Sequence, residues 1–67
     1  MLISKLISLG SRELRQKKIL SHLLDSELII SNILHQSREK TITSNDRKVD
    51  LDTVNNFKQF IKRRLKL

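Results

Sequence analysis

The chain has 67 residues, enough for one small domain but too few for a deep core or a large pocket. It contains no cysteine, so disulfides and cysteine-bound metals are excluded as stabilisers. It also contains no proline, and 37% of its residues are hydrophobic. Fourteen Lys and Arg against seven Asp and Glu leave a net charge of +7, which indicates a polyanionic partner.

The N-terminal third is expected to be helical. Apolar residues recur at one-, three- and four-residue steps along residues 2–9, as they do on one face of a helix. Gly10 interrupts this run, so it is predicted to end the first helix, with Ser11 as the N-cap of the next. The apolar stripe of that next helix consists of Leu14, Ile19, Leu20, Leu23 and Leu24.

A turn is predicted near Asp25, where a short polar run separates two apolar segments. Residues 28–34 form the densest apolar stretch and are expected to be buried on more than one side. With the turn, the two segments fold into a helical hairpin. Without it, one helix of about 25 residues continues and needs a partner to cover it.

Residues 37–51 have a different pattern, because charged and β-branched residues alternate at 40–43 and again at 48–51. The residues between them, Ser44 to Asp46, are typical of a turn. The segment is either a short β-hairpin or a loop that pins apolar side chains to the core. The Asn-Gly or Asp-Gly pair of a two-residue hairpin turn is missing, but both alternatives remain open.

The last predicted helix begins near Asp50 and Asp52, whose negative charge is favourable at a helix N-terminus. Its core-facing stripe is expected to contain Val54, Phe57, Ile61 and Leu65, with Phe60 at the edge. The fold predicted for residues 1–67 is therefore a single all-α domain. It is a small bundle of three or four short helices with an irregular or hairpin-like connection at 37–51, either dimeric or part of a complex.

Catalytic patterns are missing from the sequence. His22 and His35 have no neighbour at metal-ligand or triad spacing, and there is no glycine-rich phosphate loop. We therefore expect a non-enzymatic protein with no cofactor, no metal site and no small-molecule substrate. The lack of cysteine favours a cytoplasmic protein, and MLISKLISLG is too short to span a membrane. A membrane partner is not expected, since Lys5 alone gives little electrostatic support for binding to a membrane surface.

Positive charge is concentrated in the second half, where residues 38–67 carry nine basic and four acidic side chains. Clustered cations neutralise phosphates and release counterions, so double-stranded DNA is the favoured partner. The candidate nucleic-acid-binding residues are Lys58, Lys62, Arg63, Arg64, Lys66, Arg47, Lys48 and Asn55. The apolar face of residues 2–9 exceeds what a monomer of this size needs, and its candidate partner-interface residues are Leu2, Leu6 and Leu9.

The stretch Thr53–Leu67 resembles the recognition helix of helix-turn-helix and winged-helix DNA-binding output domains. It fits a pattern close to T-V-x-x-[apolar or His]-x-x-x-[I/L]-x-[K/R]-[K/R]-L at Thr53, Val54, Ile61, Arg63, Arg64 and Leu65. Ser11–Leu24 is more loosely similar to the first helix of such domains. The resemblance implies that Thr53 caps the helix at the DNA groove and that the basic end meets phosphates. It departs from the family before Thr53, where TITSNDRKVDL does not read as a helix.

Two functions are consistent with these patterns. The first is a small transcriptional regulator that contacts DNA through its basic C-terminal helix. The alternative is a helical adaptor or assembly subunit that binds partners through its apolar N-terminal face and an acidic protein through its basic tail. The two hypotheses differ in whether retention on a duplex falls steeply with salt.

Overall fold

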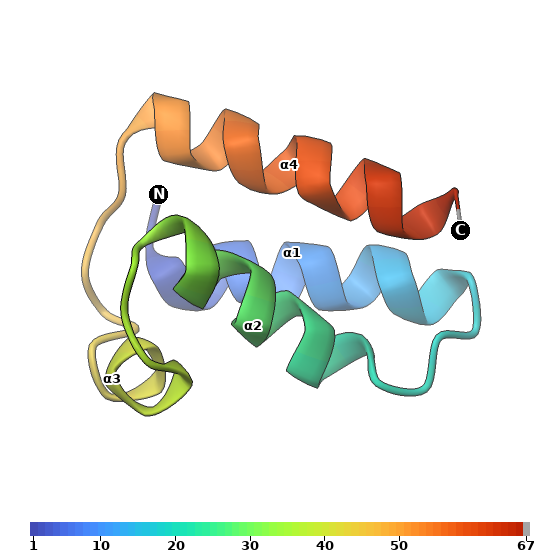
Figure 1. The fold of residues 1–67 in the computed structure, drawn as a ribbon, viewed down its shortest axis with the longest axis horizontal. Helices are drawn as coiled ribbons and strands as arrows, with labels where there is room; N and C mark the ends of the chain where they lie inside the picture. Colours follow the sequence, from blue (N-terminus) through green and yellow to red (C-terminus); the bar gives the residue numbers. More distant parts are fainter. Residues whose placement is uncertain (67) are drawn as a thin grey trace.

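The computed structural model describes residues 1–66 and is built from four α-helices (Figure 1). They are α1 (Ile3–Gln16), α2 (His22–Ile33), α3 (Arg38–Thr43) and α4 (Leu51–Leu65). No strand occurs among these 66 residues, and an isolated bridge joins Leu2 to Lys48. The prediction of an all-α bundle of short helices is confirmed. The last residue of the stretch Thr53–Leu67 lies outside the part of the chain that the structure describes.

The helices α1, α2 and α4 lie together and enclose the core, while α3 sits at the end of the molecule where α2 finishes (Figure 1). In Figure 1, α1 and α4 run in the same direction, and α2 runs in the opposite direction. The core is formed by eight apolar side chains from these three helices, namely Ile3, Leu6, Ile7, Leu14, Ile30, Val54, Phe57 and Ile61.

Gly10 does not end a helix, contrary to the prediction. It lies inside α1 and is buried, because α4 and α2 approach the α1 backbone at this point. A Cβ atom added to Gly10 would lie 2.5 Å from Cζ of Phe57 and 2.7 Å from Oγ of Ser26. The glycine is therefore needed for close helix packing. Ser11, which was expected to cap a new helix, is an interior residue of α1.

The turn between the first two long helices lies at residues 17–21, before the predicted position near Asp25. Lys18 has a left-handed φ of 61°, and the backbone N–H of Ile19 donates to the carbonyl of Leu14 at 3.1 Å. This is the Schellman arrangement that usually carries glycine at the left-handed position. Because lysine occupies this position, the turn could not be recognised from the sequence, and Ser11–Leu24 is not one helix.

The end of α2 repeats this arrangement. His35 has a φ of 55°, and the N–H of Gln36 donates to the carbonyl of Ser31 at 3.1 Å. The chain then leaves α2 and starts α3 at Ser37, whose hydroxyl accepts a hydrogen bond from the Lys40 N–H at 3.1 Å. The hairpin-like alternative for residues 37–51 is therefore wrong, because capping by Ser37 and burial of Thr41 favour a short helix.

The side chains of α2 are distributed differently from the expectation. Its buried residues are Ser26, Glu27, Ile30 and Ser31, whereas Leu23, Leu24 and Leu28 are exposed. The hydroxyl of Ser26 donates to the carbonyl of Ile7 in α1 at 2.8 Å, so a small polar residue occupies the contact where the two helices are close. The stretch 28–34 is only partly buried, and Leu28 in particular faces outward.

Candidate functional site

Helix α4 has the orientation that its pattern predicted. Val54, Phe57 and Ile61 are buried, and the Asp50 carboxylate caps the helix by accepting a hydrogen bond from the Thr53 N–H at 2.9 Å. Hydrogen bonds from Thr53, first from its side chain and then from its backbone, hold the pKa of Asp50 below its usual value. Thr53 is therefore the third helical residue rather than the cap that the resemblance implied.

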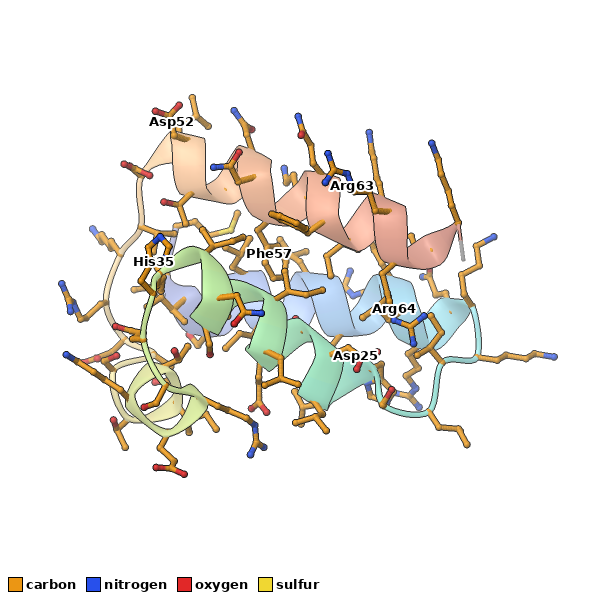
Figure 2. The ribbon with its side chains drawn as sticks, viewed as in Figure 1. Asp25, His35, Asp52, Phe57, Arg63 and Arg64 are labelled. Atoms are coloured by element: carbon orange, nitrogen blue, oxygen red, sulfur yellow. The ribbon has the colours of Figure 1, made fainter. Side chains whose placement is uncertain are left out.

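The predicted basic residues do not form one surface. Lys58, Lys62, Arg63 and Lys66 are exposed along α4, and Asn55 is exposed one turn earlier. Arg64 lies on another side of the helix, where its Nε is 3.2 Å from Oδ2 of Asp25 in α2. Its guanidinium joins two helices and is not part of the exposed row, as Figure 2 shows.

The other two predicted cations, Arg47 and Lys48, lie in the segment between α3 and α4. The carbonyl of Arg47 accepts a hydrogen bond from the Ile3 N–H at 2.9 Å, and Lys48 forms the bridge with Leu2. These contacts fix both residues beside the start of α1. They are therefore at the opposite end of α4 from Lys62 and Lys66 (Figure 1).

The predicted apolar interface on the first helix is occupied by the core. Leu6 is 1% exposed and packs with Phe57 and Ile61, so its assignment to a partner interface is wrong. Leu2 is half-buried, and Leu9 remains exposed. The stripe was read correctly as one face of a helix, but α2 and α4 cover that face within the same chain.

An apolar groove lies between α2 and α4 and was not predicted. It has a volume of about 330 Å³ and is lined by Ile29, Asn32, Ile33, His35, Asn56 and Phe60. We call these six residues the α2–α4 groove. Phe60 is 44% exposed, and the guanidinium carbon of Arg63 lies 5.4 Å from the centre of its ring. The position of Phe60 at the edge of the apolar stripe of α4 was the one sign of this groove in the sequence. The wall that α2 contributes could not be inferred from the sequence.

A second apolar surface lies on the outside of α2. It consists of four exposed leucines, Leu20, Leu23, Leu24 and Leu28, which we call the α2 leucine surface. Leu20, in the turn before the helix, is 97% exposed. Large apolar side chains that stay exposed on a small domain are a feature of protein-binding surfaces.

The two histidines have separate environments. Nδ1 of His22 lies 2.6 Å from Oγ of Ser11, a hydrogen bond that joins α1 to the start of α2. His35 lines the α2–α4 groove. Within residues 1–66 no three His, Cys, Asp or Glu side chains gather at a point where they could bind a metal, and no helix is long and apolar enough to cross a membrane.

The fold and these surfaces define a small, basic, all-α domain. A family model described as the PrmC N-terminal domain matches residues 5–66, and the chain belongs to this family. No curated protein and no solved structure matches the chain.

The family corrects the functional predictions. It is a methyltransferase-associated helical domain and not a winged-helix DNA-binding domain, so the predicted DNA-binding transcription regulator is wrong. The pattern at Thr53–Leu67 misled because an acidic start, a basic end and one apolar stripe stabilise amphipathic helices in general. The PrmC N-terminal domain belongs to a protein-glutamine methyltransferase, and residues 5–66 of this chain match that helical domain alone. The expectation of a non-enzymatic protein therefore stays a prediction.

Proposed function

We propose that the chain acts as the protein-binding helical domain of a protein-glutamine methyltransferase. The observation that carries this proposal is the family match over residues 5–66. An enzyme that modifies a glutamine side chain in a protein has to hold that protein, and a helical domain with exposed apolar surfaces is suited to this task.

The described residues do not fit a nucleotide-like methyl donor. Such cofactors commonly bind at a glycine-rich turn between a strand and a helix. The one glycine of the chain, Gly10, lies inside α1 and is covered by Phe57, and no strand is present in residues 1–66. We therefore assign no step of methyl transfer to these residues, and the proposal concerns recognition of the protein substrate.

Competition kinetics test the proposal. The chain would be added in excess to the full PrmC-type enzyme from the same organism, acting on that enzyme's protein substrate. We expect inhibition that is competitive with the protein substrate and not with the methyl donor, because the chain sequesters the substrate protein. A lack of inhibition, or inhibition that excess methyl donor relieves, contradicts the proposal. Bovine serum albumin at the same mass concentration is the control for nonspecific effects.

A further inference from the structure

The α2–α4 groove has two apolar walls that its own chain leaves partly uncovered. Ile29 and Ile33 from α2 form one wall and Phe60 from α4 forms the other. Ile29 and Ile33 pack against the core but remain partly accessible, and Phe60 is nearly half exposed. A volume of about 330 Å³ is at the lower end of the range for small-ligand pockets, which suits one or two apolar side chains.

The polar residues of the groove match a peptide backbone. Asn32 and Asn56 line the groove from its two helices, and both are exposed. A side-chain amide offers both donors and an acceptor, so the pair is able to bind the N–H and C=O groups of an extended segment. The groove therefore combines apolar walls with side-chain amides that donate and accept hydrogen bonds.

One end of the groove carries a cation that the described chain does not neutralise. Arg63 stacks on Phe60, and within residues 1–66 no carboxylate lies within ion-pair distance of it. Arg38 and Arg64, by contrast, are paired with Glu27 and Asp25. An arginine held over an aromatic ring keeps its planar fork available for a carboxylate.

The charged side chains near the groove indicate which kind of partner it is able to bind. Arg63 lies toward the C-terminal end of α4, while Asp52 lies at its start, as Figure 2 shows. A second copy of the chain would bring a net charge of +7 to a surface that is already positive, so charge disfavours a homodimer at this site. An acidic segment with an apolar side chain satisfies both the walls and Arg63.

We propose that the α2–α4 groove binds an acidic segment of the protein substrate, with an apolar side chain between Ile33 and Phe60 and a neighbouring carboxylate on Arg63. This inference rests on the proposed function and specifies the surface and the chemistry of the partner. It shares Arg63 with the predicted basic tail, but it uses neither the face of residues 2–9 nor the exposed lysines along α4.

Variants in the competition assay test the groove. Phe60→Ala and Arg63→Glu are each expected to raise the inhibition constant about tenfold, because each removes a central contact. Arg12→Glu is the matched control: it makes the same change of charge on the outer face of α1, and we expect a change of less than about twofold. Circular dichroism checks that each variant keeps the helix content of the parent chain.

The outcomes separate the two proposals. If the parent chain does not inhibit, the proposed function fails. If the parent chain inhibits and Phe60→Ala and Arg63→Glu inhibit equally well, the groove proposal alone fails. A loss caused by Leu24→Ser with Leu28→Ser, but not by the groove variants, assigns binding to the α2 leucine surface and also overturns it.

A direct binding measurement addresses the chemistry of the occupant. A fluorescein-labelled peptide of alternating Leu and Glu residues is titrated with the chain, next to peptides in which Glu is replaced by Gln or Leu by Ser. We expect only the Leu–Glu peptide to bind, with affinity that falls as salt is added. Equal binding of the Gln peptide would contradict the proposed contact between a carboxylate and Arg63. Equal binding of the Ser peptide would contradict the proposed apolar contact in the groove.

Discussion

Helix α2 is in contact with the other three helices, but its contacts with α1 and α4 differ in chemistry from its contacts with α3. Helices α1 and α4 pack on α2 around the apolar side chains of Ile30 and Phe57, and the Ser26 hydrogen bond and the Arg64–Asp25 ion pair add to these contacts. Helix α3 has no side chain in the apolar core and is held by polar contacts. The hydroxyl of Thr41 lies 2.9 Å from that of Ser31 and accepts from Nε2 of Gln36 at 3.0 Å. Apolar burial supplies most of the stability of a fold, while hydrogen bonds add little net free energy but fix direction.

This contrast implies that stability is unevenly distributed. The three-helix core is expected to open only in global unfolding, while α3 opens locally at a lower free energy. The ion pair between Arg38 and Glu27, at 2.9 Å, adds to the attachment of α3, although nearly half of the arginine side chain is accessible to water. Substitutions in the core should therefore affect the whole chain, and substitutions under α3 only one end of it.

The largest effect is expected for Phe57→Ala. The Phe57 side chain is fully buried against α1, and its removal leaves a cavity that costs about 3–5 kcal/mol, comparable with the total stability of a domain of this size. Chemical denaturation monitored by circular dichroism measures the loss. Phe60→Ala is the matched control on the same helix, and we expect it to cost clearly less; equal losses would contradict the assignment of Phe57 to the core.

The next effect is expected for Gly10→Ala. Alanine favours a helix over glycine by about 1 kcal/mol, but its Cβ would collide with the Phe57 ring, and overpacking of this kind costs about 1–3 kcal/mol. We therefore expect a net loss of stability. Ser8→Ala, at an exposed position of α1, is the control and should be neutral or slightly stabilising.

The mechanism of the Gly10 effect is tested by a double variant. Phe57→Leu in the Gly10→Ala background should cost less than Phe57→Leu in the parent chain, because the smaller side chain makes room for the new methyl group. Additive losses in the denaturation midpoints would show that the two residues do not compete for the same space.

A smaller and more local effect is expected for Thr41→Val. The substitution keeps the shape but removes the hydroxyl that contacts Ser31 and Gln36, at a cost of about 1–2 kcal/mol. Hydrogen exchange should accelerate in residues 38–43 more than in α1 and α4. Thr43→Val is the control, because the hydroxyl of Thr43 is exposed and bonds only within α3. Uniform acceleration across all helices would argue that α3 belongs to the core.

The parts of the fold that could be predicted from the sequence are those that depend on local periodicity. In α4, the apolar and charged residues separate cleanly around the helix, so the buried face was identified from local periodicity. The role of Gly10 depends on the Phe57 ring and on Ser26, which both lie far along the chain, and periodicity does not contain that information. The turn at Lys18 was missed because a lysine holds the backbone conformation that glycine usually marks.

The candidate site was predictable to a smaller extent. Arg63 and Phe60 were recognised on α4, but the groove needs Ile29 and Ile33 from another helix. Their position depends on the crossing of α2 over α4, which follows from tertiary packing and not from either segment alone. Arg64 was assigned to the basic surface for the same reason: its partner Asp25 lies on α2 and was expected in a turn.

The smallest expected effect concerns Asp50, at the junction between the α3 segment and the core. Hydrogen bonds from Thr53 lower the pKa of Asp50 below the ordinary value of 3.8, so the folded chain binds fewer protons there than the unfolded chain. This contribution to stability is present above pH 3.8 and is lost as the pH falls through the folded-state pKa. In Asp50→Asn the cap still accepts a hydrogen bond but no longer titrates. Urea midpoints should therefore fall less on acidification in Asp50→Asn than in the parent chain, and an unchanged acid response in Asp50→Asn would show that the cap does not couple to pH.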